Sequence, residues 1–128
     1  MPKERDEERL ALLLRLLADT ASNVVLFKER AFRGSGEPDD LGLDHLLPPE
    51  LSREQKKQRL KTALAESVRQ SPPNRVDVPG DKDMDLDPAV FYEFRFVLAG
   101  TPVYVKTELK EDDPAEPILI VMTVKRQN

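Results

Sequence analysis

Five side chains in the C-terminal third have the types and spacing needed to bind and cleave a phosphodiester. They are Glu93, Arg95, Tyr104, Lys106 and Lys125, and they alternate with apolar residues along the chain. Because side chains along a strand point alternately to its two faces, we expect these five to share one face of a sheet. The cations could hold a phosphate by charge-assisted hydrogen bonds, and the tyrosine could orient it or donate a proton. A glutamate of suitable pKa could act as general base toward a ribose 2′-hydroxyl, without a metal ion.

Three strand-like segments must position these side chains. They span residues 89–98, 102–110 and 117–126, with the short connections Ala99-Gly100-Thr101 and 111–116 between them. Short connections between neighbouring strands predict an antiparallel meander.

The two faces of this predicted sheet differ in polarity. One is nearly all apolar, and its expected members are Tyr92, Phe94, Phe96, Leu98, Val103, Val105, Thr107, Leu109, Ile118, Ile120, Met122 and Val124. The other face carries the charged residues together with Phe91, Val97, Leu119 and Val121. A half-solvated antiparallel sheet has this pattern without any function, so the charges alone do not identify an active site.

Two helices are predicted N-terminal to these strands. Residues 3–21 carry leucines at helical spacing, and Ser52 with Gln55 forms a capping-box pattern for a second helix that ends near Gln70. The buried stripe of the second helix is expected to be Leu60, Ala63, Leu64 and Val68, and its basic outer face Lys56, Lys57, Arg59 and Lys61. The sequence therefore predicts a two-layer α+β fold, with N-terminal helices packed on a C-terminal antiparallel sheet of at least three strands.

The remaining segments give weaker signals. Residues 24–33 begin with strand character and continue with residues suited to a helix, so both interpretations stay open. Residues 39–47 are suited to a single helical turn. Residues 72–88 contain four prolines and four alternating aspartates and are predicted to form a flexible acidic loop. These aspartates lack the glycine and the glutamate of an EF-hand, so no calcium site is predicted.

Composition narrows the classes of protein. The 128 residues fit one domain, 1–128, and contain no cysteine, which excludes a disulfide scaffold, a thiolate zinc site and a cysteine nucleophile. The single histidine, His45, is interpreted as a solvated side chain, and no metal or cofactor site is predicted. The net charge of −4 lacks the basic surplus of most nucleic-acid binders, so an RNA contact must use a local basic patch.

Membrane and export signals are missing from the sequence pattern. No apolar run has the length of a membrane span. The charged start and the apolar stretch interrupted by Arg15 do not form a signal peptide. We therefore expect a cytoplasmic protein with no membrane partner.

Several short segments are similar to one protein family. They are Asp40-Leu41-Gly42-Leu43-Asp44, then Gly100-Thr101-Pro102-Val103-Tyr104-Val105-Lys106, and finally Ile118-Leu119-Ile120-Val121 with Val124-Lys125. They resemble the RelE-like bacterial toxin ribonucleases, above all the MqsR-type (motility quorum-sensing regulator) mRNA interferases. By this resemblance Tyr104 corresponds to the family's catalytic tyrosine and Lys125 to its basic residue near the C-terminus. Lys106 lies in an equivalent position on the same strand as the tyrosine.

The resemblance and the charged face together predict a toxin-antitoxin-type, metal-independent endoribonuclease that cleaves mRNA and leaves a 2′,3′-cyclic phosphate. The expected partners are RNA, a cognate antitoxin protein and a second copy of the chain. The predicted catalytic residues are Tyr104, Lys125, Lys106 and Glu93, and the predicted RNA-binding residues are Arg95, Arg126, Lys56 and Lys57.

Two other functions stay open at this point. The first is a non-enzymatic protein-binding module of the same fold that uses the open sheet face. The second is a small-ligand site between sheet and loop, which has no motif behind it. Convergence of Arg95, Tyr104, Lys106 and Lys125 in a cleft favours the nuclease, whereas a flat face with an apolar centre favours the binding module.

Overall fold

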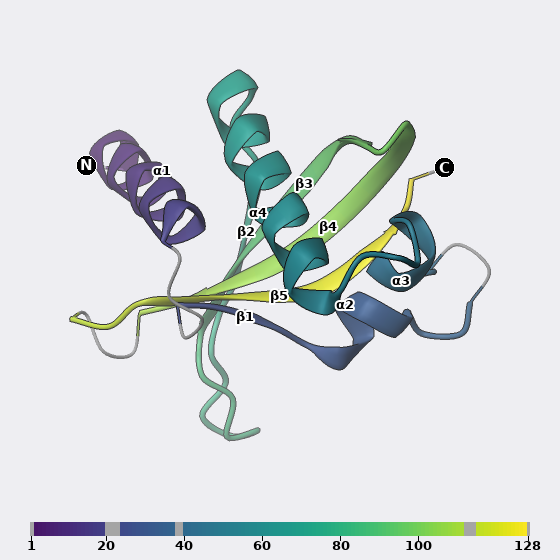
Figure 1. Cartoon of the computed structure of the whole chain (residues 1–128). Helices are drawn as coiled ribbons and strands as arrows, with labels where there is room; N and C mark the ends of the chain where they lie inside the picture. The colour runs from purple at the N-terminus through teal and green to yellow at the C-terminus, as the bar shows by residue number, and fades with distance from the viewer. Residues whose placement is uncertain (1, 20–23, 38–39, 112–114, 128) are drawn as a thin grey trace.

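Helices lie over one face of a five-stranded sheet in this chain (Figure 1). The computed structural model describes residues 2–19, 24–37, 40–111 and 115–127. In chain order the elements are α1 (Pro2–Ala18), β1 (Val25–Phe27), α2 (Glu29–Arg33), α3 (Leu43–Leu46), α4 (Arg53–Gln70), β2 (Asn74–Val78), β3 (Ala89–Leu98), β4 (Thr101–Lys110) and β5 (Ile118–Arg126). The predicted two-layer α+β arrangement is confirmed.

The sheet has the strand order β1-β5-β4-β3-β2. The predicted antiparallel meander of β3, β4 and β5 is present, with boundaries within one residue of those expected. The short strand β1 adds a parallel partner to β5. Both interpretations of residues 24–33 are correct in part, because β1 is followed directly by α2.

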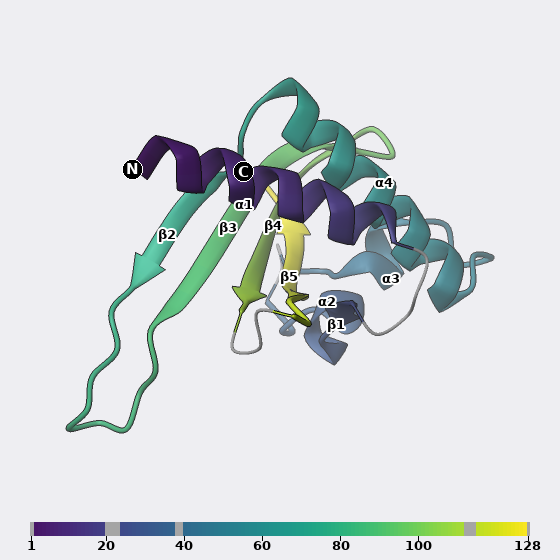
Figure 2. The ribbon, with the colours of Figure 1, turned by 90° about the vertical axis from the view of Figure 1, so that its left-hand side faces the viewer.

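The strand β2 corrects the predicted loop at 72–88. It pairs with β3 in antiparallel register over five residues, from Asn74 with Glu93 to Val78 with Ala89. The chain then continues as a narrow hairpin whose tip is closed by a bridge between Asp81 and Leu86. This hairpin projects beyond the rest of the sheet (Figure 2).

The helix α4 starts where its capping signal predicts. The Ser52 hydroxyl accepts the Gln55 N–H at 3.2 Å, and the Gln55 side chain accepts the Ser52 N–H at 2.8 Å, so two otherwise unpaired donors are satisfied. The helix ends at Gln70 as expected. The first helix, α1, ends at Ala18 rather than near residue 21, and residues 20–23 lie outside the described part of the chain. None of the described helices is long and apolar enough to cross a bilayer.

The core lies between α1, α4 and the covered face of the sheet. Its fully buried side chains include Leu13, Leu60, Leu64, Phe94 and Val105. The sheet residues among them alternate with the charged residues of the open face. Burial of this face on the helices therefore determines which side chains of β3 and β4 remain on the open side.

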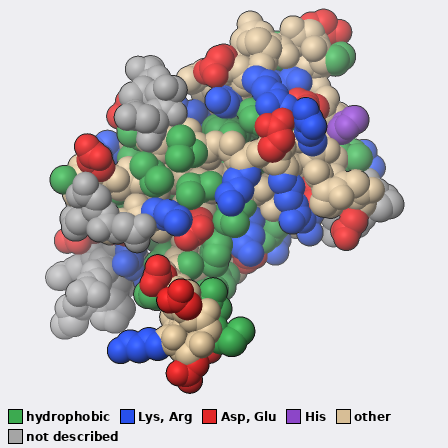
Figure 3. Space-filling model, turned by 90° about the horizontal axis from the view of Figure 1, so that it is seen from below, with side chains coloured by type: hydrophobic (Ala, Val, Ile, Leu, Met, Phe, Trp, Pro, Cys, Tyr) green, Lys and Arg blue, Asp and Glu red, His purple; other side chains and the backbone are tan. Residues whose placement is uncertain are grey.

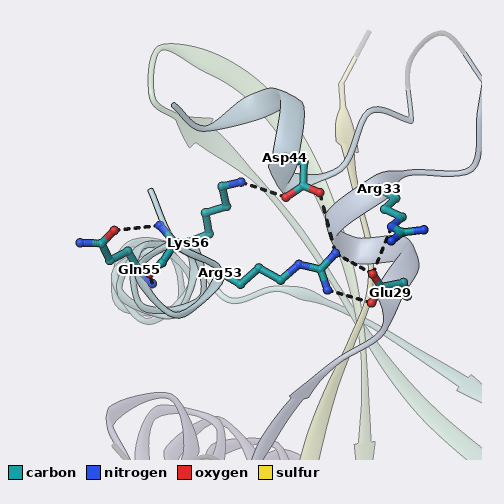
Figure 4. A network of polar contacts seen from close by, with 7 residues as sticks. Glu29, Arg33, Asp44, Arg53, Gln55 and Lys56 are labelled. Carbon is teal, nitrogen blue, oxygen red and sulfur yellow. Dashed lines mark hydrogen bonds and ion pairs between the residues drawn. The ribbon is translucent and has the colours of Figure 1, made fainter. Parts of the chain in front are cut away.

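Two lysines of α4 do not belong to the outer face predicted for them. Lys56 is 6% exposed and Lys61 is 5% exposed. The Lys56 ammonium lies 2.9 Å from the Asp44 carboxylate, as Figure 4 shows, and Lys61 donates to the Asp19 carbonyl at 2.6 Å. Their aliphatic stems can pack against the protein while the charged ends reach these partners, which explains the burial.

A β-bulge in β5 corrects the predicted faces of this strand. Lys106 pairs with Thr123 and Thr107 pairs with Val121, so Met122 is an extra residue opposite β4. Leu119 and Val121, predicted on the open face, are buried in the core, while Ile118, Ile120 and Met122 are only partly buried. The predicted face was wrong for these five residues. In an unbroken apolar run no polar residue alternates with the apolar ones, so the sequence does not show which residues face the core.

The segment between β1 and α4 continues along β5 by backbone contacts. The Lys28 N–H donates to Val121 at 3.0 Å, and the Gly42 N–H donates to Val124 at 3.1 Å. Gly42 has a φ of 72°, and a Cβ added there would lie 2.4 Å from the Phe32 carbonyl oxygen. Glycine is therefore required for this close approach.

Candidate functional site

Two rows of polar side chains cross the open face of the sheet. In the first row Tyr104 of β4 lies between Arg95 of β3 and Lys125 of β5, its register partners. In the second row Lys106 of β4 lies between Glu93 and Thr123. All the predicted catalytic residues are thus neighbours on three adjacent strands.

The bulge at Met122 is what aligns Lys125 with Tyr104. Leu119 and Val121 face the core, and uninterrupted alternation from them would direct residue 125 into the core as well. The extra residue reverses the alternation, so that Val124 is buried and Lys125 reaches the open face. Bulges often re-aim side chains in this way beside functional sites.

An open hollow of about 520 Å³ lies over the first row. Its lining residues are Glu37, Glu93, Arg95, Tyr104, Lys125, Arg126 and Gln127. Figure 3 views the molecule from this side and shows Lys and Arg side chains gathered beside a patch of hydrophobic ones. The hollow is thus lined by three cations and two carboxylates, although the whole chain has a net charge of −4. Lys106 is not one of its lining residues but is the register partner of Glu93, which is.

The hydroxyl of Tyr104 donates a hydrogen bond to Glu93 Oε2, and Asn74 Nδ2 donates to Glu93 Oε1 at 2.9 Å. The Tyr104 bond, followed by the Asn74 bond, holds the pKa of Glu93 below its usual 4.5. Burial, reinforced by the hydrogen bond and the negative charge of Glu93, raises the pKa of Tyr104 to about 12. At neutral pH the site therefore contains a carboxylate beside a protonated phenol.

The cations of the site lie against aromatic rings. The Arg95 guanidinium carbon is 5.0 Å from the centre of the Tyr104 ring, and Lys125 Nζ is 5.2 Å from the same centre. Lys106 Nζ lies 4.5 Å from the ring centre of Phe91. Such cation–π contacts position the three charges without neutralising them, so the charges can still bind an anion.

Two of the predicted RNA-binding residues lie elsewhere. Lys56 is buried against Asp44, and Lys57 pairs with Glu54 at 3.3 Å. Both belong to α4, on the covered side of the sheet. Their neighbour Arg53 binds both carboxylate oxygens of Glu29, at 2.9 and 2.6 Å (Figure 4). This surface is a set of ion pairs within α4 and between α4 and its neighbouring helices, so Lys56 and Lys57 do not join the hollow.

Sequence reasoning missed three residues of the site. Asn74 reaches Glu93 from a strand that was not predicted, and Glu37 comes from the segment between α2 and α3. Gln127 directly follows the last strand. None of the three lies in a motif, although the Val-Asp-Val run after Asn74 is a weak signal for a short strand.

No family model matches this chain, and neither a curated protein nor a solved structure matches it. The resemblance to MqsR-type toxins therefore stays a prediction.

Proposed function

We propose that this chain is a metal-independent endoribonuclease that cleaves mRNA on the open face of its sheet. The observation that supports this proposal is the convergence of the ionised Glu93 carboxylate, the protonated Tyr104 and several cations around a single hollow. The cations attract a phosphodiester. The carboxylate and the phenol are a base and an acid in the protonation states that phosphodiester cleavage requires at neutral pH.

In the proposed reaction the scissile phosphate binds among Arg95, Lys106 and Lys125. The ribose 2′-oxygen attacks phosphorus, and its proton passes to the Glu93 carboxylate. The bond from phosphorus to the 5′-oxygen breaks, and Tyr104 gives its proton to that leaving oxygen. Glu93 then returns a proton to Tyr104 along their hydrogen bond. The products are a 2′,3′-cyclic phosphate and a 5′-hydroxyl.

The energetics suit these roles. The cations stabilise the charge that develops on the phosphate oxygens, and they are positioned before the substrate arrives. A departing ribose alkoxide is a much stronger base than a tyrosinate, so even a phenol with a raised pKa gives up its proton to it. The depressed pKa of Glu93 makes it a weak base that is nevertheless ionised at every physiological pH.

The decisive experiment is cleavage of several single-stranded RNAs by purified protein in EDTA. We expect wild type to cut them and a Tyr104→Phe, Lys125→Ala double variant to lose the activity. A substrate with a 2′-deoxy sugar at the cleavage position should resist, because the nucleophile is absent. Lys110→Ala is the matched control, since Lys110 lies on the same face of β4 outside the hollow.

A protein-binding module is the second candidate function. It is favoured by the apolar side chains on the same face, which include Phe91, Ile118, Ile120 and Val97, the last 64% exposed. In a toxin-antitoxin system both functions can coexist, with a cognate antitoxin or a second copy of the chain covering these apolar side chains. Folded wild-type protein that cuts none of the RNAs would leave this candidate as the better account.

A further inference from the structure

A second, smaller hollow adjoins the first at the edge of the sheet. Its volume is about 200 Å³, and it shares Glu93 and Arg95 with the first hollow. Its other walls are the C-terminal end of α4 with Ser67 and Ser71, the Pro72-Pro73 pair, Asn74 at the start of β2, and Phe94 of β3. This volume is below the range of about 300–1,000 Å³ typical of sites for drug-sized ligands, so it suits a smaller group.

The chemistry of these walls matches a single nucleobase. The prolines and Phe94 offer apolar surface against which a base can pack, and Arg95, whose guanidinium lies over the Tyr104 ring, belongs to both hollows. Ser67, Ser71 and Asn74 bring hydroxyl and carboxamide groups to the edges of the same hollow. A nucleobase likewise has flat apolar faces and an edge of hydrogen-bond donors and acceptors.

The hydrogen bond between Asn74 and Glu93 determines which group Asn74 offers to a ligand. An ionised glutamate only accepts hydrogen bonds, so the carboxamide must direct its NH₂ group to Glu93, as the 2.9 Å contact shows. Its carbonyl oxygen is thereby left as an acceptor. An exocyclic amino group, such as that of cytosine, would donate to this oxygen. Uracil has a carbonyl oxygen at the same position, and a carbonyl oxygen can only accept.

We infer that the hollow beside Asn74 binds the base next to the scissile phosphate and prefers a base with an exocyclic amino group over uracil. The inference rests on the proposed ribonuclease function, because Glu93 and Arg95 belong to both hollows. It adds a specificity-determining residue, Asn74, to that function. The serine hydroxyls both donate and accept, so they add affinity without discriminating among bases.

The test measures binding apart from cleavage. Short 2′-O-methyl oligonucleotides, which cannot be cleaved, are bound to wild type with either cytosine or uracil at one position. We expect the cytosine probe to bind about 2- to 10-fold more tightly, the range that one net hydrogen bond supplies. Asn74→Ala should abolish this ratio. Thr62→Ala, at an exposed position of α4, should leave it unchanged.

A second variant separates base binding from any effect on Glu93. Ser67→Ala with Ser71→Ala does not touch that carboxylate and should weaken both probes equally. If wild type cuts RNA but its cytosine-to-uracil ratio is one, or persists in Asn74→Ala, the inference is overturned and the nuclease stands. If the ratio is present and lost in Asn74→Ala but no RNA is cut, the nuclease fails, and the base preference of the hollow stands without its link to a scissile phosphate.

Discussion

The hydroxyl of Tyr104 donates a hydrogen bond to Glu93 diagonally across the β3–β4 pair, because their direct register partners are Arg95 and Lys106. The diagonal bond brings an acid and a base into one unit and leaves the cations on both sides of it. The bond lowers the pKa of Glu93, and burial together with the bond and the negative charge of Glu93 raises the pKa of Tyr104. Both protonation states are consequently insensitive to pH over the physiological range.

The first prediction concerns the ionisation of Tyr104. The chain has two tyrosines, so a Tyr92→Phe variant leaves Tyr104 as the only phenol. Its tyrosinate absorbance should rise with a midpoint near 12 rather than 10.0. Glu93→Gln removes the negative charge and should lower this midpoint. A midpoint that the Glu93 substitution leaves unmoved would contradict the role given to their hydrogen bond.

The second prediction concerns stability and pH. A phenol whose pKa is raised by folding stabilises the protein fully below its unfolded value of 10.0, and this stability is lost as pH rises to about 12. A carboxyl whose pKa is lowered stabilises fully above 4.5, and this stability is lost as pH falls through the folded value. Urea unfolding should therefore show Tyr104→Phe approaching wild type in alkali and Glu93→Gln approaching it in acid. Differences that stay constant with pH would refute both assignments.

The sequence predicted β3 and β4 closely, because polar and apolar residues alternate there and a tight turn joins the two strands. It could not predict the phase of β5, where five consecutive apolar residues precede Thr123 and only the pairing with β4 reveals the bulge. It missed β2, a short edge strand between prolines and aspartates. It also misplaced Lys56, since its partner Asp44 comes from another element. Most of the site was predictable, but its Asn74 depended on tertiary pairing.

The third prediction tests the bulge through two neighbouring residues. Leu119 is 0% exposed, whereas Ile120 lies partly exposed on the open face. Leu119→Ala should lower the free energy of unfolding by about 2–5 kcal/mol, the usual cost of a buried cavity. Ile120→Ala should cost markedly less. Equal losses, or a larger loss for Ile120→Ala in denaturant titrations, would contradict the bulge. Such a result would favour the strict alternation predicted from the sequence, with Ile120 on the covered face.

The fourth prediction concerns the Lys56–Asp44 pair on the covered side. Asp44→Ala leaves a nearly buried ammonium without its carboxylate and should destabilise the protein. Lys56→Met keeps the stem volume and removes the charge, so its stability should stay close to wild type. Thermal unfolding of the two variants checks the order. RNA binding should be unchanged in Lys56→Met, since Lys56 lies outside the hollow; a clear loss of RNA affinity would return it to the binding surface.

The last prediction is the salt dependence of RNA binding, which counts the phosphate contacts. For single strands, each phosphate neutralised contributes about 0.7 to the slope of log affinity against log salt concentration. Lys125→Ala and Arg95→Ala should each reduce the slope of a non-cleavable RNA by about this amount. Lys57→Ala, which removes a cation engaged with Glu54 on α4, should not. Because all three substitutions change the net charge equally, a slope that falls alike in all of them would mean that RNA responds to overall charge. Selective reductions would instead locate the phosphates on the row of Arg95, Tyr104 and Lys125.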